Sequence, residues 1–247
     1  MRIAVLADIH GNLRALEAVQ RDMKRQSPDL VVNLGDHLSG PLQAAATADA
    51  LMAASYVTIR GNHDRQLLDR PAASMGPSDR AASAQLSDTH RDWLRLLPAV
   101  HELDPAILLC HGTPADDLQY LLETVNASGV SLTVPATIRG RLGGARAEFV
   151  LCGHSHIARV GSVDSVQIVN PGSVGLPAYD DIQPYPHYME SGSPHARYAV
   201  VDRDGTGYVS LLAIEYDWMA ASREAKQAGR PDWAHALATG YALREGS

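Results

Sequence analysis

The chain has 247 residues, of which 45% are hydrophobic and 20% are charged, and its formal net charge is −7. This length predicts one large domain or at most two, and the composition supplies a sizeable core without any sign of disorder. The acidic balance argues against a protein that wraps long nucleic acid without sequence preference, because such a protein needs a basic surface.

Several sequence features bear on the cellular compartment. The N-terminus reaches Asp8 after five apolar residues, which are too few for the core of a signal peptide. No apolar run approaches the roughly 18 residues that a membrane-spanning helix requires. Cys110 and Cys152 lie inside apolar runs, which favours buried reduced thiols over a disulfide. We therefore expect a cytoplasmic protein without a membrane segment.

The first part of the chain alternates predicted strands and helices. Apolar runs with β-branched residues indicate strands, and apolar residues at helical spacing indicate helices. In chain order the expected elements are a strand over 3–7, a helix from 13 that ends at 27–28, a strand over 30–35, a helix over 42–54 and a strand over 56–61. This order predicts parallel neighbouring strands that are joined by right-handed crossovers.

The middle of the chain is less regular. Residues 65–99 are expected to form a turn-rich helical excursion, in which Ser87 or Asp88 caps a short helix that Pro98 stops. This excursion either forms one wall of a pocket or only covers the sheet. The elements expected after it are a hairpin of strands over 100–103 and 106–110, helices over 117–125 and 135–142, and a strand over 149–153.

The last part of the chain consists of short strands and turns, followed by helices. Two strand pairs are expected, and Asp202-Arg203-Asp204-Gly205 is a strong hairpin signal inside the second pair. Two helices are expected within 217–247. The expected strands are 157–161 with 166–169, and 196–201 with 208–215. Strand–helix alternation followed by hairpins predicts an α/β (α+β) fold with a mixed sheet or two packed sheets and with helices outside.

Five of the apolar runs end in side chains that can bind metal ions. In open α/β sheets, ligands bind beyond the carboxyl ends of the strands, so these side chains should gather at one edge. Asp8 and His10 are expected to project to the same side, because side chains alternate along a strand. The candidate donors are Asp8, His10, Asp36, Asn62, His111, His154 and His156.

These donors predict a particular kind of metal chemistry. Seven nitrogen and oxygen donors are too many for one tetrahedral ion, and they suit two ions that share a carboxylate. Mixed carboxylate, imidazole and amide ligands favour Mn²⁺ first, with Fe, Zn²⁺ or Ni²⁺ as alternatives, over Ca²⁺. Two such ions clamp the attacking and leaving oxygens of an in-line displacement at phosphorus. The spacing alone leaves open which carboxylate bridges the ions.

The order of these motifs resembles that of the calcineurin-like metallophosphoesterases, and in particular of their small bacterial phosphodiesterase and phosphatase branch. The resemblance covers about residues 1–175 and implies a four-layer αββα sandwich with two mixed sheets and a dinuclear metal site at the strand ends. We accordingly expect residues 1–247 to form a single domain. The matching motifs are Asp8-x-His10, Gly35-Asp36, Gly61-Asn62-His63-Asp64, His111, Gly153-His154-Ser155-His156 and Asn170-Pro171-Gly172-Ser173.

The same resemblance implies a role for each residue. His63 would be the acid that stabilises or protonates the leaving oxygen, and Asp64 the carboxylate that orients it. Arg60 and the backbone at His63 are candidate phosphate contacts. The metal ligands would be Asp8, His10, Asp36 and His156 for one ion, and the bridging Asp36 with Asn62, His111 and His154 for the other.

Two features depart from the family pattern. His37 directly follows Asp36, where the family commonly has an apolar or small residue, and it is either a solvent-facing loop residue or a substrate contact. Residues 179–195 are longer than the corresponding segment of short family members and are rich in Tyr, Pro and His. This inserted loop is either a lid that contacts a base or sugar, or a surface insertion or oligomer contact.

Together these observations predict a metal-dependent phosphoester hydrolase in which a metal-bound hydroxide attacks a small phosphomonoester or phosphodiester, with nucleotides among the candidates. The alternative is a catalytically lapsed metal-binding scaffold that acts through protein partners. The intact His63-Asp64 pair argues against the scaffold, since a scaffold needs no acid for a leaving group. The expected partners are a small substrate and, as an open option, further copies of the chain, but neither long nucleic acid nor a membrane.

Overall fold

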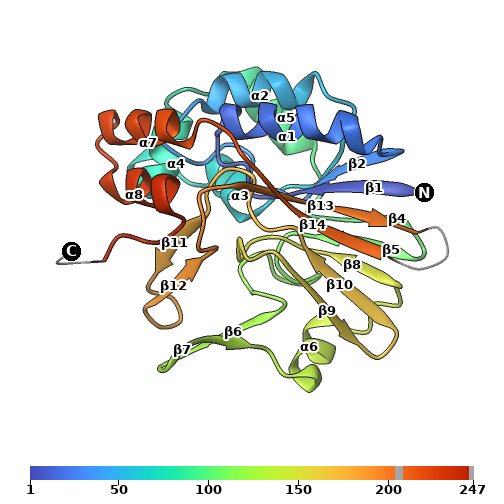
Figure 1. Cartoon of the computed structure of the whole chain (residues 1–247). Coiled ribbons are helices and arrows are strands. Elements are labelled where there is room, and N and C mark those ends of the chain that lie inside the picture. The colour runs from blue at the N-terminus through green and yellow to red at the C-terminus, as the bar shows by residue number, and fades with distance from the viewer. Residues whose placement is uncertain (204–207, 245–247) are drawn as a thin grey trace.

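The computed structural model describes residues 1–203 and 208–244. Within these residues, two five-stranded sheets pack face to face and carry helices on their outer sides (Figure 1). The first sheet has the order β14 (Tyr208–Ile214), β13 (Ala196–Asp202), β1 (Arg2–Leu6), β2 (Leu30–Asn33) and β3 (Val57–Thr58). The second has the order β4 (Val100–Asp104), β5 (Ile107–Cys110), β8 (Phe149–Leu151), β10 (Val166–Asn170) and β9 (Arg159–Val163).

Both sheets are mixed, and each has a parallel centre. Strands β1, β2 and β3 run parallel, whereas β13 is antiparallel to β1. In the second sheet β5, β8 and β10 run parallel, and β4 and β9 are antiparallel edge strands. The register pairs Leu6 with Asn33 in the first sheet and Leu109 with Leu151 in the second. The chain therefore leaves the neighbouring parallel strands of each sheet at the same edge.

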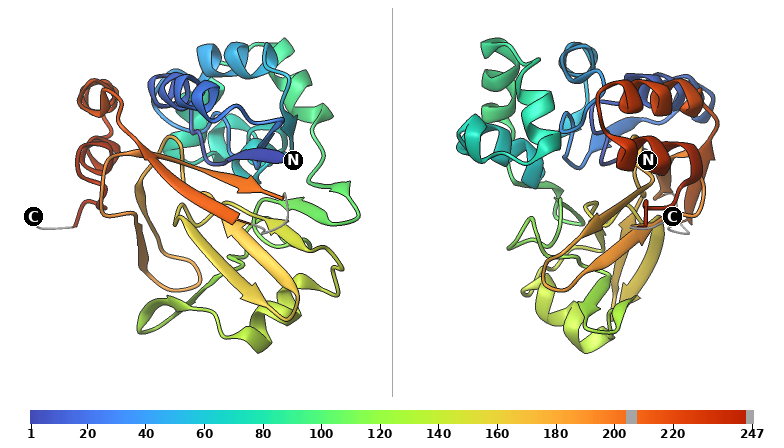
Figure 2. Two further views of the ribbon diagram at one scale, coloured as in Figure 1. Left: turned by 45° about the vertical axis from the view of Figure 1, so that its right-hand side comes forward. Right: turned by 90° about the vertical axis from the view of Figure 1, so that its left-hand side faces the viewer.

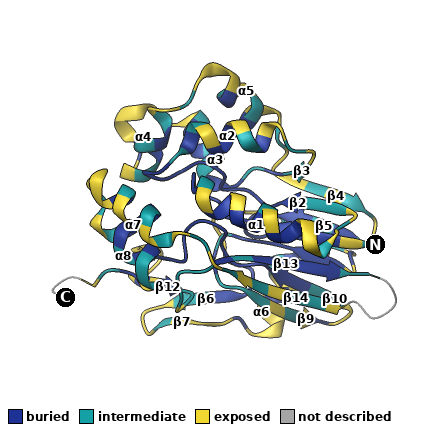
Figure 3. Ribbon diagram, turned by 45° about the horizontal axis from the view of Figure 1, so that its top comes forward, coloured by how far each residue is buried: buried dark blue, intermediate teal, exposed yellow. Residues whose placement is uncertain are grey.

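The core follows from the alternation of side chains along β1. Ile3 and Val5 face the second sheet and pack with Ile107 and Leu109, while the intervening residues face the helices outside. All four of these side chains are fully buried. Figure 3 shows the same division on α1, whose inner face is buried and whose outer face is exposed. Burial on both faces explains why β1 reads as a continuous apolar run.

Helices cover the outer face of the first sheet, above it in Figure 1. The N-terminal cap of the first helix is Asn12, whose Oδ1 accepts a hydrogen bond from the Ala15 N–H at 3.2 Å. These helices are α1 (Leu13–Gln26), α2 (Ala44–Met52), α3 (Asn62–Asp69), α4 (Pro77–Ser83) and α5 (Asp88–Leu96), with a short 3₁₀ turn, η1 (Ala72–Ser74), between α3 and α4.

The C-terminal helices and the segments around the second sheet complete the molecule. Figure 2 shows, in its right-hand view, the helices of the 65–99 excursion and the C-terminal helices on opposite sides of the same end of the molecule. None of the helices within the described residues is long and apolar enough to cross a bilayer. The remaining elements are α6 (Pro135–Leu142), α7 (Trp218–Gln227), α8 (Pro231–Thr239), and the hairpins β6 (Glu123–Asn126) with β7 (Gly129–Leu132) and β11 (Ala178–Asp181) with β12 (His187–Glu190).

The predicted αββα sandwich with two mixed sheets is confirmed, although the outer layer of the second sheet combines α6 with the β6–β7 hairpin (Figure 1). The prediction of a helix over 117–125 is wrong. Leu121 and Leu122 pack on the outer face of the second sheet, and the chain then enters β6, which pairs with β7. The apolar spacing that suggested a helix is thus satisfied by a bend followed by a strand.

Other expectations differ in detail. The third strand, expected over 56–61, is only two residues long, and Asn62 already begins α3. The inserted segment 179–195 is mostly the β11–β12 hairpin rather than an irregular loop. The hairpin signal at 202–205 lies between β13 and β14, which pair as expected, but Asp204 and Gly205 lie outside the described residues, as do residues 245–247 of the C-terminal segment.

Candidate metal centre and active site

The candidate metal donors lie on turns just beyond the strand ends. Strand β1 ends at Leu6, so Asp8 and His10 converge through a turn rather than through strand alternation. Unusual backbone geometry marks these turns, since several non-glycine residues adopt positive φ angles. Such conformations are uncommon outside glycine and cluster at functional sites. They are Asp8 (56°), His10 (52°), Asp36 (55°), His154 (68°) and His156 (59°).

Backbone hydrogen bonds hold the turns together. The Asp8 N–H donates to the Gly35 carbonyl at 3.0 Å, and the His10 N–H donates to the Asp36 carbonyl at 3.0 Å. The turn after β1 is thereby fixed against the turn after β2. Gly61 approaches this second turn so closely that a Cβ atom there would overlap the Asp36 carboxylate. The sequence motif Gly-Asn-His thus needs its glycine for space, because the φ of Gly61 is −93°, which any residue can adopt.

We expect Gly61→Ala to displace the Asp36 carboxylate, because the new methyl group would occupy its position. Overpacking of this kind typically costs about 1–3 kcal/mol of stability. Thermal unfolding and metal content after dialysis against metal-containing buffer would measure both effects. Gly140→Ala is the matched control, since Gly140 lies in α6, where an added Cβ would meet no described atom within 4 Å outside the neighbouring backbone of its own helix. Equal metal content and equal melting temperatures in the two variants would contradict this account of Gly61.

The first donor group consists of Asp8, His10 and His156, whose ligand atoms all lie within 4.8 Å of one another. The Nδ1 atoms of both histidines face backbone carbonyls, that of Ser39 at 2.8 Å and that of Leu176 at 2.7 Å. These contacts place the proton of each neutral ring on Nδ1. The two Nε2 lone pairs then face each other at 3.1 Å. Two lone pairs at this distance repel each other, and a cation bound between them would turn the repulsion into attraction.

The second donor group consists of Asp36, His111 and His154. His111 directs Nδ1 to the Leu34 carbonyl at 2.8 Å, and its Nε2 lies 3.2 Å from Asp36 Oδ2. His154 directs Nε2 to the Leu118 carbonyl at 3.0 Å, which leaves its Nδ1 for the site. This group again brings one carboxylate and two imidazole nitrogens to a common point. Carbonyl-oriented histidines of this kind are typical of metal ligands.

The two groups lie side by side, and the structure brings all seven predicted donors together. His111 Nε2 is 3.9 Å from Asp8 Oδ1, which links the groups, and the amide of Asn62 lies 3.0 Å from the same nitrogen. Asp8 Oδ1 is buried without any hydrogen-bond partner within the described residues. A buried carboxylate oxygen of this kind calls for a positive charge. The donor set therefore fits two adjacent cations.

Protonation preferences agree with this fit. Burial, assisted by His156, lowers the pKa of His10 to about 4, and burial together with His111 lowers the pKa of His154 to about 3. Both rings are therefore neutral, which is the form that binds metal ions. Burial alone would also lower the pKa of His111, but Asp36 and Asp8 outweigh it and raise that pKa to about 10. The carboxylates of Asp36 and Asp8 thus favour a positive charge beside His111.

His63 lies beside the donors but is oriented by a residue that the sequence did not suggest. Its Nδ1 is 2.8 Å from Oδ1 of Asp79, which comes from α4 in the helical excursion. Burial alone would lower the pKa of His63, but the Asp36 and Asp79 carboxylates outweigh it and raise the pKa to about 9. The expectation that Asp64 orients His63 is therefore wrong, although Asp64 directly follows it in sequence.

Asp64 instead organises the backbone around Asp36. Its carboxylate accepts hydrogen bonds from the N–H groups of Asp36 at 2.8 Å, His37 at 3.0 Å and Gly61 at 2.9 Å. It is completely buried. One carboxylate thereby ties the turn after β2 to the start of α3, which is the reason that it points away from the ring of His63.

The structure also corrects the two candidate substrate contacts, His37 and Arg60. His37 is completely buried, with Nδ1 2.7 Å from Asp64 Oδ2 and its ring 5.3 Å from that of Trp93. It therefore neither faces solvent nor reaches a substrate. Arg60 does not line the cavity described below, and its backbone N–H donates to the Pro98 carbonyl. Neither residue is placed to bind a phosphate.

A cavity of about 810 Å³ opens over the metal donors. The excursion contributes Gln66, Arg70 and Ser78 to its lining, so this segment does form a wall. Other parts of the lining come from the β11–β12 hairpin and from the region around α8, including Arg230 and Trp233. A cavity of this size holds a small molecule.

The β11–β12 hairpin touches the site through Tyr179. The Tyr179 ring packs edge-on against the ring of His156 at 4.7 Å, and its hydroxyl donates to the His154 carbonyl at 3.0 Å. Tyr120 stacks on the His154 ring at 4.8 Å and hydrogen-bonds to Tyr179. Two tyrosines therefore brace the histidines that follow β8. In sequence, only the aromatic content of 179–195 pointed to such contacts.

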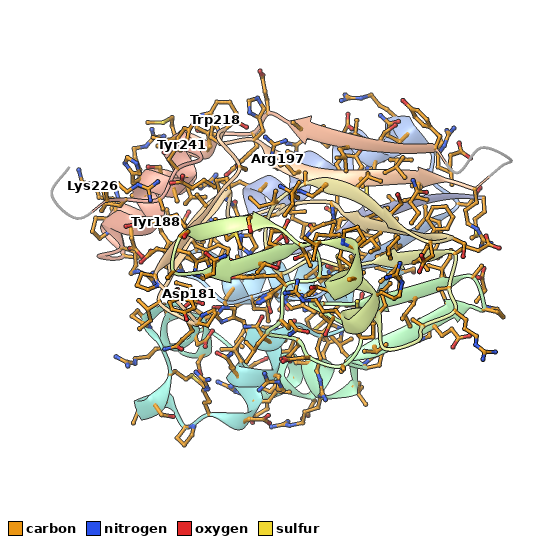
Figure 4. The ribbon with its side chains drawn as sticks, turned by 90° about the horizontal axis from the view of Figure 1, so that it is seen from below. Asp181, Tyr188, Arg197, Trp218, Lys226 and Tyr241 are labelled. Atoms are coloured by element: carbon orange, nitrogen blue, oxygen red, sulfur yellow. The ribbon has the colours of Figure 1, made fainter. Side chains whose placement is uncertain are left out.

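The far side of this hairpin packs next to the C-terminal segment. Figure 4 shows Tyr188 on the same side of the molecule as Tyr241 and Lys226. The guanidinium of Arg244 lies 3.5 Å from the centre of the Tyr188 ring, and the Ala242 N–H donates to Glu190 at 3.0 Å. The hairpin is thus held between the metal donors and the end of the described chain.

Comparisons with known proteins agree with this architecture. A family model of the calcineurin-like phosphoesterase superfamily domain matches residues 1–189. An uncharacterized protein of Methanocaldococcus jannaschii is 22% identical over 256 residues, which cover 94% of each chain. Among solved structures, a metallophosphoesterase from Sphaerobacter thermophilus has a TM-score of 0.75 at 24% identity, covering 97% of this chain and 99% of that one.

A hypothetical protein from Pyrococcus horikoshii OT3 has a TM-score of 0.73 at 19% identity, covering 98% of this chain and 99% of that one. These structural likenesses show a shared fold over nearly the whole chain. The family model adds sequence evidence over more than half of it, including every candidate metal donor. The resemblance inferred from the motifs is confirmed, and the chain belongs to the calcineurin-like phosphoesterase superfamily.

Proposed function

We propose that the protein is a metal-dependent hydrolase of small phosphoesters with two divalent ions at the adjacent donor groups. The supporting observation is the convergence of buried carboxylate oxygens and imidazole nitrogens, in which the Nε2 atoms of His10 and His156 lie 3.1 Å apart and Asp8 Oδ1 has no hydrogen-bond partner within the described residues. Asp36 is proposed as the bridging ligand, since its carboxylate lies beside His111 and also accepts the His63 N–H. When bound, the ions would polarise the phosphoryl oxygens and make hydroxide available at neutral pH.

The full ligand assignment divides the donors between the two ions. Asn62 belongs with the second group through its contact with His111. We propose Asp8, His10, Asp36 and His156 for one ion, and Asp36, Asn62, His111 and His154 for the other. Mixed oxygen and nitrogen ligands without a thiolate favour Mn²⁺, followed by Fe, Zn²⁺ or Ni²⁺.

His63 is proposed as the acid for the leaving group. It touches no donor group through its ring nitrogens, it lines the cavity, and its Nδ1 is occupied by Asp79. The remaining nitrogen, Nε2, is then available to a molecule in the cavity. A proton given to the leaving oxygen prevents a charged alkoxide from forming as the bond to phosphorus breaks.

The substrate is proposed to be a small phosphomonoester or phosphodiester, with nucleotide esters among the candidates. The size of the cavity and its Tyr179 wall favour a compact molecule with a flat or ring-shaped part. We propose the β11–β12 hairpin as one wall of this substrate site. Long nucleic acid is expected to be a poor substrate, because a chain with a net charge of −7 offers few cations for a phosphate backbone.

A substrate panel with added metals tests the proposal. Aryl and nucleotide mono- and diesters would be offered to metal-free protein and to protein supplied with Mn²⁺, Fe²⁺, Zn²⁺ or Ni²⁺. Hydrolysis that depends on the metal supports the proposal. Two ions bound per chain without hydrolysis of any ester would support the alternative of a metal-binding scaffold. Absence of metal binding would contradict both.

We expect His63→Ala to lower turnover by about 10²–10⁴ while leaving the metal content unchanged, because loss of a positioned acid has an effect of this size. Steady-state kinetics and metal analysis of the same preparations would check this. His101→Ala, in β4 and outside the lining of the cavity, is the matched control. Metal loss in His63→Ala would mean that His63 is a ligand instead.

A further inference from the structure

We infer that Asp79 is the positioning residue of His63, and that this arrangement suits phosphoesters whose leaving group is an unactivated alcohol rather than an acidic phenol. The inference rests on the proposed function and adds both a residue and a substrate class to it. Asp79 belongs to α4, outside every motif that links this chain to its family.

The Asp79 carboxylate contacts two side chains, those of His63 and Ser39. Its Oδ1 lies 2.8 Å from His63 Nδ1 and accepts the hydroxyl of Ser39 at 2.6 Å. The residue is only 2% exposed, so these contacts are shielded from water. Burial alone would raise the pKa of Asp79, but the hydrogen bonds from His63 and Ser39 hold it below its usual value. An ionised carboxylate is therefore fixed against one side of the imidazole.

The start of α4 is anchored from two directions. The Gly40 N–H donates to the Ser78 carbonyl at 3.2 Å, and Arg230 Nη1 donates to the Ser78 hydroxyl at 2.8 Å. The first contact comes from the turn after β2, and the second from the connection between α7 and α8. Asp79 thus follows a residue that is held by two distant segments. Such support limits the freedom of Asp79, and through it that of His63.

Ser39 connects this pair to the first donor group. Its hydroxyl donates to Asp79, while its carbonyl accepts from Nδ1 of His10. The rings of His10 and His63 lie 5.7 Å apart. His63, through Asp79, and the metal donor His10 are therefore both positioned by Ser39, which limits how far the acid can move relative to the first donor group.

With Nδ1 held by Asp79, the imidazole presents Nε2 to the cavity. Hydroxide forms a new P–O bond, the P–O bond to the leaving group breaks, and its electron pair stays on the leaving oxygen. The proton of His63 Nε2 joins that oxygen, and water returns a proton to His63. An alkoxide is a strong base and needs this proton, whereas an acidic phenol can depart as an anion. A rigidly held acid therefore benefits alcohol esters most.

The test is a series of methyl, ethyl, phenyl and p-nitrophenyl esters of one phosphate, hydrolysed by wild-type protein and by Asp79→Asn. We expect Asp79→Asn to lower kcat by about 10–10²-fold for the alkyl esters and by less than about threefold for the p-nitrophenyl ester. Metal content should not change. Asp92→Asn, on an exposed carboxylate of α5, is the matched control, and Asp79→Glu should restore part of the loss.

A second measurement does not depend on activity. Proton and ¹⁵N NMR of the metal-free wild-type protein should show a downfield Nδ1 proton on His63, which disappears in Asp79→Asn and His63→Ala. An equal loss across the ester series, or no loss at all, would overturn the inference, as would the absence of that proton in the wild type. If the wild-type protein cleaves none of the esters, the proposed function fails, while the NMR signal still decides whether Asp79 holds His63.

Discussion

Asp36→Asn is expected to weaken metal binding by more than about 10²-fold and to abolish measurable hydrolysis. The reason is that this carboxylate is the proposed shared ligand and lies 3.2 Å from His111. Loss of a residue that only supports a ligand already costs about 10–100-fold in metal affinity, and a shared ligand should cost more. Metal titrations and metal analysis after dialysis would measure the effect.

The asparagine side chain keeps the oxygen that accepts the His63 N–H, so the fold should survive the change. Asp69→Asn is the matched control, since Asp69 is an exposed carboxylate at the end of α3. A metal stoichiometry in Asp36→Asn equal to that of the control would exclude Asp36 as a bridging ligand.

Asp64→Ala is expected to have the largest effect on stability among the variants considered. It would leave three buried N–H groups without an acceptor, those of Asp36, His37 and Gly61. Each buried unsatisfied group costs about 1–3 kcal/mol, so a loss on the order of 4 kcal/mol follows. Urea and thermal unfolding would measure it, with Asp69→Ala expected to stay within about 0.5 kcal/mol of the wild type.

This experiment also separates Asp64 from Asp79. If Asp64 served to orient His63, its loss would lower turnover while leaving stability near that of the control. We expect the reverse order of effects, in which stability falls first and activity follows because the turn that carries Asp36 is no longer held. A stable but slow Asp64→Ala protein would contradict the assignment.

The strand ends and most elements could be predicted from the sequence because their signals are local. The apolar run of β1 followed by Asp8, for example, can be recognised within a few residues. The family resemblance supplied what local patterns do not, namely that the strands form two sheets. The convergence of the donors then follows from the shared edge at which parallel strands end.

The errors concern residues whose surroundings come from distant parts of the chain. In 117–125 the spacing of leucines resembled a helix, whereas the segment pairs with β7 through contacts that no local pattern reveals. The Ser128-Gly129 turn signal was the one available hint of a hairpin there. His37 is buried because Asp64 and Trp93 enclose it.

Asp79 was missed for the same reason. It lies in a turn-rich excursion, and nothing in its neighbourhood marks it as different from other acidic residues. Its significance depends on the folded distance to His63 and Ser39. Motifs identify the ligands because these follow strands directly, but the residues that orient a side chain can come from any segment that packs nearby.

Each donor group contains residues from both sheets. Asp8 and His10 follow β1 of the first sheet, whereas His156 follows β8 of the second, and Asp36 likewise meets His111 across the same boundary. A bound ion would therefore act as a cross-link between the two halves of the sandwich, closing a long loop of chain much as a disulfide does. Such a cross-link would oppose separation of the two sheets during unfolding. The same metal ions that are proposed to support hydrolysis would then also lower the rate at which the protein unfolds.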